Sequence, residues 1–331
     1  MPILGSKGAA SAGGFGFGGG SPFICATGGT IVDCGDYRTH IFTGPGSFVV
    51  SKAGSGPTNN VDYLVVAGGG GASLGTSGAG GAGAGGFRLS NVYSLPSMSP
   101  LSNPTGIPVL SQTYPITVGA GGPLGSCSPI PQGVPGNPSV FSTITSTGGG
   151  GGGGYPCAPG LPGGSGGGAG NPGGAGGTGN TPPVSPSQGN SGGTGLTLGA
   201  GPEPNHRQGG GGGGAGAIGT DANPSTNGGP GGDGSFIADG FIGPTAPSYG
   251  TPGPVGSTRY FAGGGGGGSQ LNGAPGGAPG GAGGGGSGAA SGPTGGSNGT
   301  INTGGGSGGR YGCSHPGVGG SGIVMIRYKY K

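Results

Sequence analysis

The stretch Thr145-Ser-Thr-Gly-Gly-Gly-Gly-Gly-Gly-Gly-Tyr-Pro156 places seven consecutive glycines between a β-branched run and a Tyr-Pro pair. Similar runs recur at 68–71, 209–214, 263–268 and 283–286. Inside a helix or strand, glycine costs about 0.5–1 kcal/mol relative to alanine, because it has more conformational freedom to lose. A chain that repeats such runs is therefore either disordered or built from glycine backbone.

The composition narrows these two alternatives. Glycine supplies 106 of the 331 residues, whereas ordinary chains contain about 7%. Collagen is excluded because it needs glycine at every third position, and residues 97–106 and 148–154 break that spacing. Disorder of the whole chain stays open, since Gly/Ser/Pro-rich segments often remain unfolded. Disordered chains usually owe their solvation to charge, and this chain has only 5% charged residues and a net charge of +3.

The scarcity of aromatic side chains, 6% with no Trp, indicates an interior of backbone packed on backbone. Every buried N–H and C=O then needs a partner. The polyglycine II helix, here called a rod, has three residues per turn, about 3.1 Å rise and no internal hydrogen bonds, so that neighbouring rods can bond to one another. We predict that 148–154 is the most buried rod of a bundle. The GGX-type stretches 163–170 and 276–286 are expected to form outer rods, with Ser165 exposed.

Short β-branched or aromatic runs between turn residues predict strands. Several lie in residues 21–66, and others run directly into glycine after residues 66, 118, 145 and 261. The repeated order is a strand, a glycine rod and a proline-rich turn. The final strand, 323–330, is expected to pair with 63–66 and 114–118, because a short terminal strand needs partners. No segment has helical periodicity longer than a few residues.

The expected fold is therefore mainly β and irregular, with almost no α-helix. It combines a small antiparallel β-sheet region with a bundle of glycine-rich polyglycine II helices. Four segments are expected, which are an anchoring segment at 1–20, an N-terminal β region at 21–66, a rod bundle with short strands and Pro-rich turns at 67–322, and a closing strand at 323–331.

Four stretches combine a short apolar run with glycines. They are Tyr63-Leu-Val-Val-Ala-Gly-Gly-Gly-Gly71, Gly80-Gly-Ala-Gly-Ala-Gly-Gly-Phe-Arg88, Tyr114-Pro-Ile-Thr-Val-Gly-Ala-Gly-Gly122 and Gly319-Gly-Ser-Gly-Ile-Val-Met-Ile-Arg-Tyr328. These stretches resemble the glycine-rich domain of bacteriophage tail-fibre and adhesin proteins. The opening residues 1–11, with 39–44 and 46–50, are similar to such proteins in phages of marine cyanobacteria. The resemblance implies a layered sandwich of polyglycine II rods whose tip loops bind host surface receptors. Residues 155–260 match no pattern of that family.

Residues that could carry chemistry are few and scattered. The match of Gly14–Gly19 to G-x-G-x-x-G is expected by chance in so glycine-rich a chain, and no helix follows it. The carboxylates form no clear acid/base pair, so we interpret them as solvated turn residues. The histidines are far apart without ligands at metal spacing, and His40 is interpreted as the polar face of a strand. The chain is therefore not expected to be an enzyme, and no cofactor or metal is expected.

Cysteine usage and charge bear on location and partners. Five cysteines argue against a full disulfide framework, although Cys25 and Cys34 could face each other across a hairpin. The first residues show no signal peptide and no segment is apolar enough for membrane insertion, so we expect synthesis in a host cytoplasm. Nucleic-acid binding is not expected, because basic residues cluster only in Arg327, Lys329 and Lys331, which we interpret as protecting a sheet edge.

Three function classes remain open. The first is a virion fibre or adhesin, located on the tail or capsid surface, whose turns contact a host glycan or protein. The second is a structural virion component without a receptor, such as a head decoration or fibre shaft. The third, an ice-binding protein, is disfavoured because threonines do not hold three-residue spacing along a rod. Homo-oligomers are possible in each class.

Candidate sites follow from the first of these classes. Glycine rods offer neither charge nor aromatic surface, so receptor specificity must reside in the turns, and we select His206, Arg207 and Tyr249 as receptor-binding candidates. Residues 1–20 lack the apolar surface to fold alone, and Phe15 and Phe17 are expected to anchor them on another virion protein.

Overall fold

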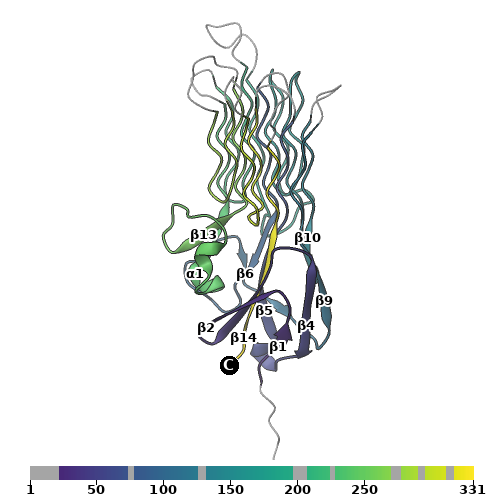
Figure 1. The fold of residues 1–331 in the computed structure, drawn as a ribbon, viewed down its shortest axis with the longest axis vertical. Coiled ribbons are helices and arrows are strands. Elements are labelled where there is room, and N and C mark those ends of the chain that lie inside the picture. The colour runs from purple at the N-terminus through teal and green to yellow at the C-terminus, as the bar shows by residue number, and fades with distance from the viewer. Residues whose placement is uncertain are drawn as a thin grey trace, which may run out of the picture.

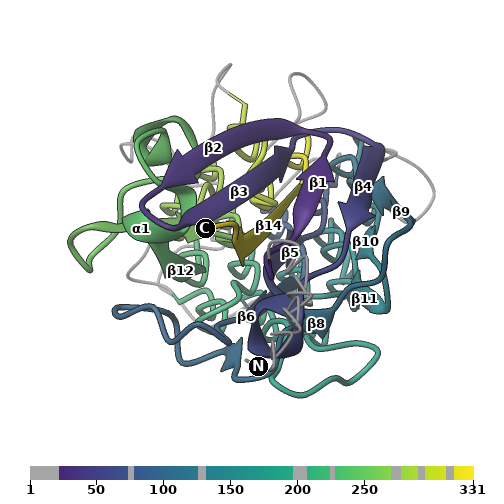
Figure 2. The ribbon, with the colours of Figure 1, turned by 90° about the horizontal axis from the view of Figure 1, so that it is seen from below.

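The computed structural model describes residues 22–73, 78–125, 132–196, 207–223, 228–269, 277–289, 295–310 and 317–331. The molecule is elongated, with a β-rich base at one end and glycine segments running away from it side by side (Figure 1). Seen from below, the strands of the base lie in front of the rods (Figure 2). The described residues contain one α-helix, the four-residue α1 (Asp239–Ile242). The expected class, mainly β and irregular with almost no helix, is confirmed.

Two sheets form most of the base. The first has five strands in the order β1-β4-β9-β10-β11, all paired antiparallel. Its strands are β1 (Cys25–Thr27), β4 (Gly46–Lys52), β9 (Thr113–Thr117), β10 (Ser139–Phe141) and β11 (Ile144–Ser146). The second sheet has seven strands in the order β2-β3-β14-β5-β6-β7, with β8 paired to β5. Its strands are β2 (Thr30–Cys34), β3 (Tyr37–Phe42), β5 (Asn60–Val66), β6 (Phe87–Ser90), β7 (Ser102–Asn103), β8 (Ile107–Pro108) and β14 (Ile323–Lys329).

A third layer covers the far side of the seven-stranded sheet. It consists of a hairpin, formed by β12 (Ser235–Ala238) and β13 (Thr258–Phe261), and two short helices, α1 and the 3-10 helix η2 (Ala246–Ser248). The remaining 3-10 helix of the described residues, η1 (Gly56–Asn59), precedes β5. Phe241 and Phe261 of this layer pack with Leu64 and Met325 in one core cluster. On the opposite face, Phe48 and Tyr63 belong to the other cluster. Successive residues of a strand point to opposite faces, so β5 and β14 need apolar residues at nearly every position.

The closing strand does not sit where the sequence suggested. β14 pairs with β5 as expected, but its other partner is β3 and not the strand at 114–118, which is β9 of the first sheet. β14 is thus a central strand, and the interpretation of Arg327 as edge protection is wrong. Both faces of β14 carry apolar residues, and these require a covered position in the middle of the sheet.

The glycine segments form a hydrogen-bonded bundle. Successive rods run away from the base and back: 67–73, 78–86, 118–125, 132–138, 147–154, 158–164, 165–171, 175–179, 188–196, 207–215, 217–222, 228–234, 262–269, 277–282, 284–289, 295–300, 304–310 and 317–322. In rod 78–86, Gly80 and Gly83 donate to Gly153 and Gly150 of rod 147–154, both at 2.8 Å. A contact to the same neighbour every third residue is the pattern that polyglycine II requires. The helical dihedral angles themselves stay a prediction.

The centre of the bundle is rod 78–86 and not the seven-glycine run. Rod 78–86 donates backbone hydrogen bonds to three neighbouring rods, which are 147–154, 207–215 and 304–310. It accepts backbone hydrogen bonds from three others, which are 67–73, 165–171 and 262–269. The run 148–154 is buried throughout but lies in this surrounding ring. Ala79, Ala82 and Ala84 of the central rod are fully buried, so a methyl group fits at these positions between rods.

The prediction of an outer rod at 163–170 is also wrong. Rod 165–171 is buried along its length, and Ser165 is 0% exposed. A Cβ added at Gly168 would lie 2.2 Å from the carbonyl oxygen of Gly210, so this rod tolerates no side chain there. The physical reason is that glycine and serine spacing does not distinguish a solvent face from a face covered by another rod.

Candidate functional site

The ends of the rods opposite the base, here called the far end, collect the turns that join them (Figure 1). Rod 147–154 leaves β11 in the base, so the turn at Tyr155 lies at the far end. Arg207 begins a rod that runs back toward the base, and its guanidinium lies 4.7 Å from the centroid of the Tyr155 ring. Pro156 and Cys157 beside them are exposed. The far end thus presents a cation–π pair among turn residues.

The structure separates the candidate receptor residues. Arg207 lies at the far end, whereas Tyr249 follows η2 in the base and packs against the core cluster of Phe241 and Phe261. The carbonyl oxygen of Tyr249 also accepts a hydrogen bond from Arg259 Nε at 2.7 Å. Seven residues of a rod span roughly 20 Å, so Arg207 and Tyr249 do not share one contact surface. His206, Phe15 and Phe17 lie outside the described residues.

A buried ion pair lies in the middle of the seven-stranded sheet. Asp62 and Arg327 are cross-strand partners in β5 and β14, with Asp62 Oδ2 and Arg327 Nη1 3.6 Å apart. Asp62 Oδ1 accepts hydrogen bonds from Val92 N at 2.6 Å and Ser90 Oγ at 3.1 Å. Burial nevertheless raises the pKa of Asp62 to about 6. The interpretation of Asp62 as a solvated turn residue is therefore wrong, because strand pairing places this carboxylate under the third layer.

His40 is buried as well, although its sequence suggested an exposed polar face. Its Nδ1 lies 2.6 Å from the carbonyl oxygen of Gly28 and its Nε2 lies 2.9 Å from the hydroxyl of Tyr328. A carbonyl can only accept, so Nδ1 carries the proton and Nε2 accepts from Tyr328. Burial lowers the pKa of His40 to about 4. The two sheets, by packing face to face, cover this strand position.

The remaining chemical groups do not assemble into a metal or redox centre in the described ranges. No group of three or more His, Cys, Asp or Glu residues there could hold a metal ion. Cys25 and Cys34 are free thiols in different sheets, so they do not face each other across a hairpin. None of the helices in this part of the chain is long and apolar enough to cross a membrane.

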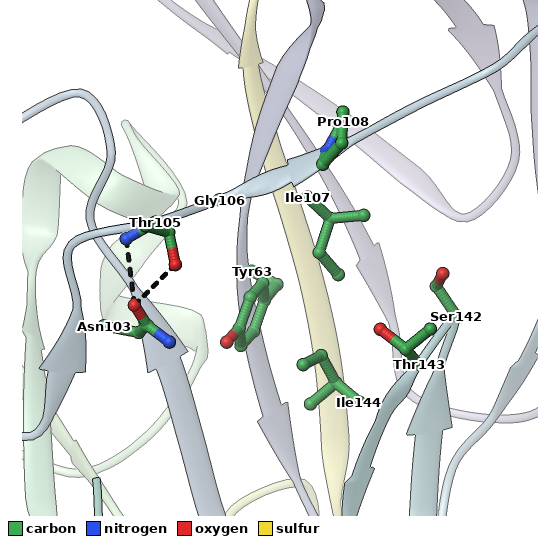
Figure 3. A pocket seen from close by; sticks show the side chains of 9 residues that line it. All are labelled: Tyr63, Asn103, Thr105, Gly106, Ile107, Pro108, Ser142, Thr143 and Ile144. Atoms are coloured by element: carbon green, nitrogen blue, oxygen red, sulfur yellow. Dashed lines mark hydrogen bonds between the residues drawn. The ribbon is translucent and has the colours of Figure 1, made fainter. Parts of the chain in front are cut away.

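A cavity of about 350 Å³ opens in the base, and we call it the base pocket (Figure 3). Tyr63 of β5 and the segment around β8 form two of its walls, and the β10–β11 turn forms another. The lining residues are Tyr63, Asn103, Thr105, Gly106, Ile107, Pro108, Ser142, Thr143 and Ile144. Asn103 Oδ1 accepts hydrogen bonds from Thr105 N at 2.9 Å and Thr105 Oγ1 at 2.7 Å. Nothing in the sequence marked these residues, because three distant segments supply them.

A second hollow, of about 330 Å³, lies where the third layer meets the rods. Phe236 and Tyr260 line it, with ring centroids 5.2 Å apart. Two of its three polar side chains are engaged, since Asp233 Oδ1 accepts from Ala282 N at 2.8 Å and Ser235 Oγ bonds Ser99 Oγ at 2.6 Å, which leaves the Tyr260 hydroxyl. The base pocket is therefore the better candidate for a ligand.

Fold and sites together define a class of protein in which a β-sandwich base supports a bundle of glycine rods. A family model described as a glycine-rich domain matches residues 43–329. The chain therefore belongs to the glycine-rich domain family. A comparison with curated proteins found no match.

Proposed function

We propose that this chain is a non-enzymatic fibre or adhesin of a bacteriophage particle, of the kind that its sequence resembles in marine cyanobacterial phages. In this proposal the rods form a rigid scaffold, and turns at the far end contact a glycan or protein on the host surface. The observation that carries the proposal is that the rods alternate in direction and collect turns at one end, opposite the base. Loops held on a rigid scaffold are the usual carriers of binding residues.

The positions of the two ends support opposite roles for them. The described chain starts at Pro22, whose carbonyl oxygen accepts a hydrogen bond from Ser55 N at 2.9 Å in the base. Residues 1–20 would then connect the base to other virion proteins, with Phe15 and Phe17 as contacts. At the far end, Arg207 and Tyr155 offer the hydrogen bonding and stacking that sugar rings and peptides accept.

Antibody labelling of purified particles tests the location on the tail or capsid surface. The receptor role is tested by replacing Tyr155 and Arg207 with Ala and measuring attachment of particles to host cells. Tyr249→Ala is the comparison variant, because Tyr249 lies in the base. We expect attachment to fall for the far-end variant, with particle incorporation unchanged.

The alternative is a structural virion component without a receptor, such as a head decoration or fibre shaft. It predicts labelled particles whose attachment is the same with either variant. Absence of the protein from purified particles would overturn both the adhesin and the structural alternative.

A further inference from the structure

A tyrosine hydroxyl opens onto the base pocket and has no hydrogen-bond partner among the described residues. Tyr63 is 2% exposed and lines the cavity, yet its hydroxyl makes no hydrogen bond within the described residues. A hydroxyl that opens onto a cavity and has no protein partner is able to form a hydrogen bond with a ligand or water there. Burial also raises the pKa of Tyr63, so the phenol stays neutral and can donate.

The other polar groups around the pocket are also available. The two hydrogen bonds from Thr105 fix Asn103 Oδ1 as the acceptor, so the Nδ2 atom of Asn103 is left to donate elsewhere. Figure 3 shows this nitrogen turned in the direction of the Tyr63 phenol. Ser142 and Thr143 add two hydroxyl groups from the β10–β11 turn, while Ile107 and Ile144 supply apolar surface between the polar groups.

The charge of the pocket restricts the ligand. None of the lining residues carries a charge at neutral pH. The nearest carboxylate in the sequence, Asp62, points to the other face of the sheet, since neighbouring residues of a strand alternate. The two charged groups that act on the Tyr63 phenol, Arg88 and Asp62, lie outside the lining, so an ionised ligand would lose its hydration without a direct ion pair inside the pocket. A purely apolar ligand would leave the hydroxyl and amide groups without partners.

We propose that the base pocket binds one neutral sugar ring, with the ring hydroxyls bonded to Tyr63, Asn103 and the turn hydroxyls and the apolar C–H face against the two isoleucines. A pyranose combines these two kinds of surface. The volume of about 350 Å³ lies at the low end of the range for small-molecule sites, about 300–1,000 Å³. This site is in the base and is separate from the far-end surface of the proposed adhesin function.

The test uses the full chain and the methyl glycosides of glucose, galactose, mannose and N-acetylglucosamine. Saturation-transfer NMR identifies binding and a titration gives the dissociation constant, expected on the order of 1 mM for a ligand of this size. Tyr63→Phe removes one hydroxyl and should weaken binding about 2–10-fold with unchanged thermal stability, because that hydroxyl has no partner in the protein.

Two matched substitutions on the β10–β11 hairpin test the location. Thr143→Tyr fills the mouth of the pocket and should abolish binding, whereas Thr145→Tyr adds the same ring at an exposed neighbouring position outside the lining and should bind as the original chain does. Binding to none of the four glycosides would overturn the proposal. Equal binding by both tyrosine variants would overturn the assigned site, and preferential binding of N-acetylneuraminic acid would overturn the neutral ligand class.

Discussion

Replacing Gly152 by alanine tests the packing of the rods directly. Gly152 lies in the ring of rods around the central one, and its added Cβ would lie 2.2 Å from the carbonyl oxygen of Gly80. Real Cβ atoms essentially never approach another atom within 3.0 Å. The two rods must therefore separate by about 1 Å at this point, because both partners of the clash are backbone.

The cost follows from the hydrogen bonds between those rods. Gly80 N and Gly83 N donate to rod 147–154 at 2.8 Å, so a separation of about 1 Å breaks both bonds. Each buried group left without a partner costs about 1–3 kcal/mol. Alanine also lowers the conformational entropy of the unfolded chain, which offsets about 0.4–1 kcal/mol of this cost. We expect Gly152→Ala to lower the free energy of unfolding by about 3 kcal/mol, which corresponds to a decrease in Tm of about 4 °C for a chain of this length.

Differential scanning calorimetry of the two variants Gly152→Ala and Gly44→Ala measures this difference. Gly44 is the control because nothing lies within 4 Å of its added Cβ and its φ is not positive. Its substitution should change the stability by less than about 0.5 kcal/mol. Equal Tm values for the two variants would refute close backbone packing of the rods. Ser165, which the sequence suggested is exposed, cannot serve as a second control because it is buried.

Further predictions concern the buried ionisable groups and the N-terminal segment. Burial lowers the pKa of His40 from 6.5 to about 4. Between these two pH values the unfolded chain binds a proton at His40 and the folded chain does not, so stability falls as pH drops from 6.5 to 4. Burial raises the pKa of Asp62 from 3.8 to about 6, so the folded state binds the proton first and stability rises as pH drops from 6 to 3.8. Between pH 7 and 4, urea denaturation should show a loss of about 3 kcal/mol for Asp62→Asn, in which the His40 effect remains. It should show a gain of about 2 kcal/mol for His40→Gln, in which the Asp62 effect remains. The same slope in both variants would contradict these assignments. Deleting residues 1–20 should leave the Tm unchanged but remove the protein from purified particles, as an immunoblot would show, and normal incorporation would exclude an anchoring role.

The sequence by itself determined which segments form strands, which form glycine rods, and the order of both along the chain. Strands at 30–34, 61–66 and 323–329 were predictable because β-branched and aromatic residues cluster between turns, and a short helix such as α1 leaves no periodic signal to detect. The glycine runs indicated backbone packed on backbone, because so few side chains could fill an interior.

Only the tertiary structure decided which elements are neighbours. Glycine rods are chemically almost identical, so no local feature distinguishes the central rod 78–86 from the longer run at 148–154. Similarly, Asp62 and His40 are polar residues in strands, and their burial depends on layers supplied by residues far along the chain. The base pocket combines Tyr63 with side chains at 103–108 and 142–144, and long-range packing of this kind leaves no trace in the spacing of residues along the sequence.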